Sequence, residues 1–147
     1  MSAFTYSDDL IRRVLTESRV IAMVGASPRP DRASNRVMRF LLDHGHTVFP
    51  VNPTCAGGMI HDHTVLGHLE TLTGDVDMVD IFRRSEFAGD AVDEAIGIGA
   101  KTVWMQLDVI DEEAAARAEN AGLTVIMDRC PVIEYRRLGM ATDKDQE

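Results

Sequence analysis

Cysteine is scarce in this chain of 147 residues, which has only Cys55 and Cys130. Two cysteines are too few for a framework of disulfides, so reduced thiols and a cytoplasmic location are expected. No apolar run approaches the ~20 residues of a membrane-spanning helix. Residues 1–9 have neither the charged nor the apolar region of a signal peptide. We therefore expect a globular protein with no membrane partner, and its length suits a single domain over residues 1–147.

Positive charge is in deficit, with 15 basic against 24 acidic residues and a net charge of −9. This balance opposes binding to nucleic acids, whose phosphates attract basic surfaces. Residues 26–39 are the exception, with a local charge of +3 from four arginines and one aspartate: Arg29, Arg32, Arg36 and Arg39 against Asp31. A basic patch on an acidic protein favours a small anionic ligand. The alternative is a solvated helix face with no ligand.

Apolar residues alternate along the chain between helical spacing and the continuous runs of buried strands. Helices are predicted at 8–17, 34–44, 85–98, 111–120 and 131–138, and strands at 19–25, 47–51, 76–82, 102–107 and 123–127. Residues 52–74 are predicted as loop with one helical turn near 66–72, and 142–147 as a frayed polar tail. Strands that alternate with helices form a parallel sheet. The predicted fold is α/β: a Rossmann-like, doubly wound, parallel five-stranded sheet in three layers.

The segment after the first predicted strand is the clearest candidate site, because ligands bind beyond the carboxyl ends of parallel strands. It begins Gly25-Ala26-Ser27-Pro28 and lacks the second and third glycines of a dinucleotide fingerprint. Backbone amides of this turn can hold a phosphate, helped by the hydroxyls of Ser27 and of Ser34, the predicted cap of the next helix. Arg32 and Arg36 can pair with its charge. The alternative is a proline-stiffened connection with arginines in solvent.

Later strand ends add candidate ligand contacts. The second strand ends in Val51-Asn52-Pro53, with no acid for the ribose hydroxyls of NAD, so NAD is disfavoured. This rigid turn suits a flat ring packed on an apolar surface, although a strand that simply ends at proline fits equally well. The third strand ends in Phe82-Arg83-Arg84, where positive charge at a helix start opposes the helix dipole unless an anion binds. Gln106, after the fourth strand, can face the same ligand.

Several motifs together resemble one family. They are Val24-Gly25-Ala26-Ser27-Pro28-Arg29-Pro30-Asp31-Arg32 with Ser34, Pro50-Val51-Asn52-Pro53, Asp80-Ile81-Phe82-Arg83-Arg84-Ser85, Gly99 to Leu107, Ala121-Gly122-Leu123, and Met127-Asp128-Arg129-Cys130-Pro131. From about residue 8 to 138, the chain resembles the small stand-alone CoA-binding proteins, whose domain is similar to the CoA-binding domain of succinyl-CoA synthetase and ADP-forming acyl-CoA synthetases. The resemblance implies a Rossmann-like fold, coenzyme A as ligand, and contacts from the turns after the first three strands. The family commonly has glycine where Asp108 stands and another near Asp62.

These observations predict a binding module for coenzyme A or an acyl-CoA, with no catalysis by this chain alone. The phosphates are expected on Gly25, Ala26, Ser27 and Ser34, with Arg32 and Arg83 or Arg84 at the anionic edge, and the adenine near Val51, Asn52 and Pro53. Phe82 and Gln106 complete the predicted site. Two alternatives stay open: a nicotinamide-dependent oxidoreductase on a divergent Rossmann domain, and a CoA-responsive regulatory or interaction protein. A homodimer or an unidentified protein partner also stays open.

Histidines and cysteines offer weaker candidate sites. The set His61, His63, His68 and Cys55 lacks the helix or cysteine pair of a typical zinc site, so solvated loop histidines and no metal are expected. Cys130 follows a strand, and we expect a buried structural cysteine there. The alternative is a reactive thiol that pairs with the thiol of coenzyme A.

Overall fold

The computed structural model describes residues 4–142. Its main sheet is built from β1 (Val20–Val24), β2 (Thr47–Val51), β5 (Met78–Ile81), β6 (Thr102–Met105) and β7 (Thr124–Ile126). The helices are α1 (Asp8–Glu17), α2 (Ala33–Asp43), α3 (Ser85–Gly97), α4 (Glu112–Asn120) and α5 (Pro131–Arg137). Four short elements lie between β2 and β5: η1 (Pro53–Cys55), β3 (Met59–Ile60), β4 (His63–Thr64) and η2 (Leu69–Leu72).

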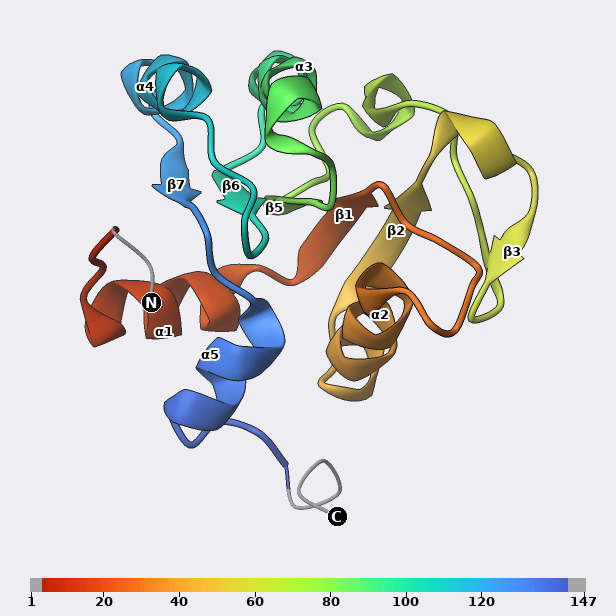
Figure 1. Ribbon diagram of the computed structural model, residues 1–147, viewed down its shortest axis with the longest axis horizontal. Helices are drawn as coiled ribbons and strands as arrows, with labels where there is room; N and C mark the ends of the chain where they lie inside the picture. The colour runs from red at the N-terminus through yellow and green to blue at the C-terminus, as the bar shows by residue number, and fades with distance from the viewer. Residues whose placement is uncertain (1–3, 143–147) are drawn as a thin grey trace.

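The main sheet has five strands in the order β2-β1-β5-β6-β7, and every neighbouring pair is parallel. Figure 1 shows α1, α2 and α5 on one face of the sheet and α3 and α4 on the other. The predicted three-layer, Rossmann-like α/β fold is therefore confirmed. The direction of strand addition reverses between β1 and β5, because β2 lies on one side of β1 and all later strands lie on the other. Ligands of such folds bind at this reversal, beyond the carboxyl ends of the strands.

The sheet separates two apolar cores. One lies toward α3 and α4 and includes Val79, Ile81 and Met105, while the other lies toward α1, α2 and α5 and includes Met23 and Trp104. All four residues of β5 and of β6 are buried, as their near-continuous apolar sequences predict. Trp104 is fully buried and its indole N–H donates to the carbonyl of Arg129 at 2.9 Å.

Helix starts follow the capping chemistry of the sequence in two cases and depart from it in a third. Ser7 caps α1 and Asp111 caps α4, each accepting from a backbone N–H three residues later. The prediction that Ser34 caps α2 is wrong, because the N-cap is Arg32 and Ser34 lies inside the first turn. The carbonyl of Arg32 already accepts from the N–H groups of Asn35 and Arg36, which closes that turn before Ser34 can act as a cap.

Residues 52–74 contain structure that the sequence did not predict, a small antiparallel hairpin formed by β3 and β4. The segment after it runs along the outer edge of β2, where the N–H of Leu66 donates to Pro50 and the carbonyl of Leu66 accepts from Asn52. Pro50 therefore sits in an outer strand of the main sheet, where a residue without an N–H is tolerated.

The predicted tail, 142–147, lies outside the described residues except for Thr142. Across residues 4–142, no helix has the length and apolar character needed to cross a membrane.

Candidate functional site

Gly25 brings the ends of β1, β2 and β5 together. Its φ of +86° lies in the left-handed region, and its N–H donates to the carbonyl of Val51 at 2.9 Å. A Cβ at this position would overlap the carbonyl oxygen of Phe82. Only glycine allows the chain to turn here so close to the end of β5. The turn into α2 therefore begins at the strand reversal.

Two asparagine side chains hold the turn that follows. The amide of Asn52 donates to the carbonyl of Ala26 at 2.9 Å, and the amide of Asn35 donates to the carbonyl of Ser27 at 3.0 Å. The hydroxyl of Ser27 accepts from the N–H of Arg29 at 3.2 Å. The turn is thus fixed from both the β2 end and the α2 end, without the second glycine of a dinucleotide fingerprint.

A pocket of about 410 Å³ lies between this turn, α2 and the end of β5, and we call it the α2 pocket. It is lined by Gly25, Ser27, Arg29, Arg32, Ala33, Ser34, Asn52 and Phe82. No side chain caps α2 and no acidic residue occupies its first turn, whereas α1 and α4 each have a capping side chain and two acids there. Among the described residues, no backbone hydrogen bond engages the N–H groups of Ala33 and Ser34. Such N–H groups, with the positive end of the helix dipole, attract an anion.

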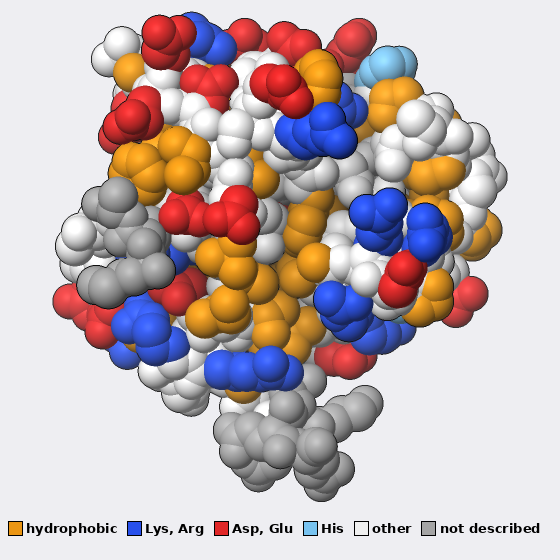
Figure 2. Space-filling view, viewed as in Figure 1, with side chains coloured by type: hydrophobic (Ala, Val, Ile, Leu, Met, Phe, Trp, Pro, Cys, Tyr) orange, Lys and Arg blue, Asp and Glu red, His pale blue; other side chains and the backbone are white. Residues whose placement is uncertain are grey.

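Arginines give the α2 pocket its charge. Arg32 is exposed and forms no ion pair within residues 4–142. Arg29 is 3.1 Å from Asp31, an exposed pair that leaves its guanidinium open to solvent. Arg39 lies near the other end of α2, where it pairs with Asp43 at 2.8 Å. Figure 2 shows basic side chains gathered over the segment that Figure 1 places between β1 and α2.

The structure brings half of the predicted site residues into this one pocket: Gly25, Ser27, Arg32, Ser34, Asn52 and Phe82. Ala26 and Val51 are buried behind it, and Pro53 begins η1 just beyond Asn52. The sequence interpretation counted Arg29 in the basic segment but did not select it as a site residue. Its signal was there, because it stands between the turn and Arg32.

Arg83, Arg84 and Gln106 do not line the α2 pocket. Arg83 is half-buried just after Phe82, and Arg84 is the N-cap of α3, with its exposed side chain 3.7 Å from Glu86. Gln106 is 6% exposed, so its side chain is inside the protein and not in the α2 pocket.

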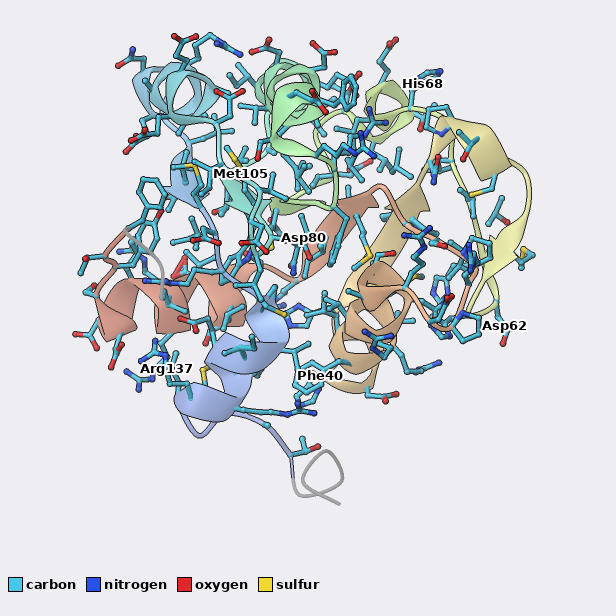
Figure 3. The ribbon with its side chains drawn as sticks, viewed as in Figure 1. Phe40, Asp62, His68, Asp80, Met105 and Arg137 are labelled. Carbon is cyan, nitrogen blue, oxygen red and sulfur yellow. The ribbon has the colours of Figure 1, made fainter. Side chains whose placement is uncertain are left out.

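Two buried polar side chains lie beneath the carboxyl edge of the sheet. Asp80 is fully buried, and neither of its carboxyl oxygens has a hydrogen-bond partner. Its strand neighbours Met23 and Trp104 place it on the side of the sheet that carries α2 and α5, and Figure 3 shows it in the middle of the molecule. Burial raises the pKa of Asp80 well above its usual value, because desolvation penalises the charged form. The Oε1 atom of Gln106 is also buried without a partner.

The histidines of the β3–β4 segment make structural contacts. The Nε2 of His61 donates to the carbonyl of Asn35 at 2.9 Å, and the Nδ1 of His63 donates to the carbonyl of His61 at 2.7 Å. The first bond holds the hairpin against the start of α2, and the second lies within the hairpin. Within residues 4–142, no group of three or more His, Cys, Asp or Glu side chains is arranged to hold a metal ion.

His46 lies at the opposite end of the sheet, before β2. Its Nδ1 donates to the carbonyl of Ser18 and its Nε2 accepts from the hydroxyl of Tyr135, both at 2.6 Å. Burial lowers the pKa of His46, so the ring is held neutral in a structural role.

A comparison against known families agrees with the fold. Residues 19–136 match the family model described as the CoA binding domain. This chain belongs to the CoA-binding domain family. The matched region contains the α2 pocket and all five strands of the main sheet.

Relatives of this CoA-binding domain cover most of its length. The protein YneT of Bacillus subtilis is 37% identical over 120 residues, which are 82% of this chain and 87% of YneT. A hypothetical protein from Pyrococcus horikoshii has 35% identity and a TM-score of 0.86, over 94% of this chain and 99% of its own. A protein from Thermus thermophilus has 31% identity and a TM-score of 0.85, over 90% of this chain and 99% of its own. A Rex-family repressor at 14% identity, with a TM-score of 0.57, shares the fold alone.

Proposed function

We propose that this protein binds coenzyme A or an acyl-CoA in the α2 pocket, and that this chain alone catalyses no reaction. The observation that carries the proposal is an uncapped helix start that faces a basic pocket at the strand reversal. The N–H groups of Ala33 and Ser34 and the hydroxyls of Ser27 and Ser34 are donors for a phosphate. Arg29 and Arg32 supply the opposite charge. The family match supports a CoA-binding module as the general role.

The adenine is assigned to the neighbouring end of β2. Asn52 lines the α2 pocket, and Pro53 follows it on the exposed surface. Asn52 is already committed, because its amide donates to Ala26 and its Oδ1 accepts from Thr54. Its role in the proposal is therefore to fix the turn, while the adenine packs beside it.

Residues at the end of β2 favour coenzyme A over NAD. A nicotinamide dinucleotide site of this fold places an Asp or Glu there for the ribose hydroxyls. This chain has Asn52 and Pro53 at that place, and Thr54 next. The hypothesis of a nicotinamide-dependent oxidoreductase therefore lacks the acidic residue that would bind the ribose.

Isothermal titration of the purified protein with CoA and with NADH tests the ligand. We expect a saturable heat of binding with CoA and no binding of NADH. We also expect excess CoA to raise the midpoint of thermal unfolding. The midpoint rises because a ligand bound only by the native state stabilises it by mass action. Saturation by NADH with no response to CoA would reject the proposal.

Arg32→Ala tests the position of the phosphates. We expect CoA affinity to fall by about 1.5–3 kcal/mol, the value of a hydrogen bond to a charged group. The free energy of unfolding changes little, because Arg32 is exposed and unpaired within the described residues. Arg12→Ala is the matched control, since Arg12 is an exposed arginine on α1 that pairs with Asp9 at 3.3 Å. Equal affinities for CoA in the two variants would place the anion elsewhere.

A further inference from the structure

A groove continues from the α2 pocket along the carboxyl edge of the sheet. Its middle part, about 280 Å³, lies between Ala33 and Phe40 of α2 and Cys130 and Ile133 at α5. Ala33 belongs to both this part and the α2 pocket. Cys130 and Ile133 also line a third hollow of about 400 Å³, which we call the far pocket. Figure 2 shows hydrophobic side chains forming a band down the middle of this face.

The far pocket has apolar walls that are open to solvent. Leu107, after β6, and Ile133, on α5, are each 48% exposed and stand on its two sides. Cys130 is buried at 8% exposure and forms its floor. Large apolar side chains that stay exposed around a hollow mark a place for an apolar ligand group.

Charge in the far pocket is opposite to that in the α2 pocket. Asp108 and Asp128 line it, and neither carboxylate forms an ion pair with any residue between 4 and 142. Arg129 also lines it, but its charge is paired with the carboxylate of Glu134, another lining residue, at 3.9 Å. The far pocket therefore has two uncompensated negative charges.

Hydrogen bonds fix the loop that carries Asp108. Its N–H donates to Oδ1 of Asp128 at 2.7 Å, and its carbonyl accepts from the hydroxyl of Ser85 at 3.1 Å. The same hydroxyl accepts from the N–H of Ile110 at 2.9 Å. Asp108 and Asp128 both have a positive φ, of 68° and 59°. The loop is thus tied to both β7 and α3, and the two carboxylates stay at the pocket.

Gln106 lies inside the protein, next to Leu107 of the far pocket. It directly precedes Leu107, and its N–H continues the strand ladder by donating to Ile81 at 3.2 Å. Two residues after Trp104 along this strand, it faces the side of the sheet that carries α5. Its Oε1 is buried with no donor within reach.

We infer that the far pocket holds the acyl end of an acyl-CoA and selects acyl groups that are uncharged or cationic over those that end in a carboxylate. The inference rests on the proposed function. Coenzyme A has its phosphates at one end and a neutral arm at the other, and the groove is basic at the α2 pocket and acidic at the far pocket. This match sets the direction of the ligand, and like charge then rejects an acyl carboxylate.

Titration with CoA, butyryl-CoA, β-alanyl-CoA and succinyl-CoA tests the inference, because the acyl groups are of similar size and differ mainly in charge. We expect succinyl-CoA to bind about tenfold more weakly than butyryl-CoA, a factor set by one like charge a few ångströms away in a partly solvated site. β-Alanyl-CoA is expected to bind at least as tightly as butyryl-CoA.

The double variant Asp108→Asn/Asp128→Asn removes the charge with little change of shape. Asparagine tolerates the left-handed backbone at both positions. In the double variant, the side-chain oxygen at position 128 can still accept the backbone N–H of position 108. We expect the preference for butyryl-CoA over succinyl-CoA to fall to about twofold or less as the like charge is lost. Asp62→Asn is the matched control, since Asp62 is exposed, has a φ of 66° and lies on the β3–β4 turn, far from α5 in Figure 3. It should keep the wild-type preference.

The outcomes separate the two proposals. CoA binding with equal affinities for butyryl-CoA and succinyl-CoA would overturn the acyl selection and leave the CoA-binding proposal standing. A preference that persists in the double variant would also overturn the inference. Failure of CoA and all three thioesters to bind would overturn the proposed function itself.

Discussion

Asp80 is an ionisable residue placed where a charge is costly. It is in the middle of β5, between Met23 and Trp104 on the neighbouring strands, and no polar group reaches its carboxyl. Burial raises its pKa, so the folded protein holds it protonated while the unfolded chain ionises it at the ordinary value near 3.8. The folded state therefore binds one proton more than the unfolded state over the pH range between the two pKa values.

The Asp80→Asn variant tests this proton balance. The contribution of Asp80 to stability is fully present below pH 3.8 and is lost as the pH rises toward the folded pKa, with a slope of about 1.4 kcal/mol per pH unit. We expect Asp80→Asn to be more stable than wild type at pH 7.5, by a few degrees in thermal midpoint, and no more stable at pH 4. Urea unfolding between pH 4 and 8 measures the difference.

Two comparisons make that measurement specific. Burial lowers the pKa of His46, so its protonation destabilises the protein as the pH falls below 6.5, and this effect is common to wild type and variant. Asp75→Asn, at an exposed aspartate before the same strand, is the control and should leave the pH slope unchanged. A wild-type slope in Asp80→Asn would show that the carboxyl is ionised in the folded protein.

The candidate site could be predicted from the sequence at the level of segments more than of side chains. The glycine turn, the missing acid after β2 and the basic charge of residues 26–39 located the α2 pocket. Arg29 was missed because charge counting cannot tell which arginine of a turn lines a pocket. Gln106 was expected at the ligand, yet it is buried, since a strand end gives no sign of how deep its side chain lies. Contact of these residues with a ligand stays a prediction.

At the scale of elements, the turn from β1 to α2 depends on a close approach that only glycine permits. Gly25→Ala should destabilise the protein by about 2–5 kcal/mol, because it adds both backbone strain and an overlap with the carbonyl of Phe82. That carbonyl has little freedom, since the N–H of Phe82 is bonded to Val24 at 2.8 Å. Urea unfolding at a pH near neutrality provides the measurement.

Gly45→Ala separates the two causes. Gly45 has a φ of +88°, almost equal to that of Gly25, but nothing lies within 4 Å of its added Cβ. We expect a cost of about 1–2 kcal/mol there, from the left-handed backbone alone. Equal costs at the two positions would mean that the approach of Phe82 to the turn is not a constraint.

Helices and strands long enough to show a repeating apolar pattern could be predicted from the sequence, and very short ones could not. The range 8–17 for α1 and the range 47–51 for β2 match the structure residue for residue. The strands β3 and β4 have two residues each, too few for any alternation to appear, and their turn uses a positive φ at His61 and Asp62 in place of glycine. The sequence pattern therefore predicts loop where the structure has this hairpin.

At the scale of the molecule, the strand order carries information that the sequence pattern does not. Alternation of strands and helices fixes a parallel sheet, but it does not say on which side of β1 the later strands are added. The order β2-β1-β5-β6-β7 places the end of β7 and the start of α5 on one side of the ligand face and α2 on the other. The groove from the α2 pocket to the far pocket exists only because of that order.

The last prediction is that this chain does not synthesise acyl-CoA. The acyl-CoA synthetases whose CoA-binding domain this chain resembles pass a phosphoryl group through a histidine. His44 and His46 lie after α2 and before β2, at the amino end of the sheet, and none of the chain's five histidines lines the α2 pocket or the far pocket. The sequence also has no G-x-x-x-x-G-K-[ST] loop to hold the phosphates of ATP. A site that orients CoA without an activated acyl donor supplies proximity for one reactant only, and acceleration requires both.

Incubation with ATP, magnesium, CoA and a panel of carboxylic acids should therefore give no acyl-CoA above the protein-free rate and no phosphohistidine. Protein-dependent turnover in that assay would make the chain an enzyme.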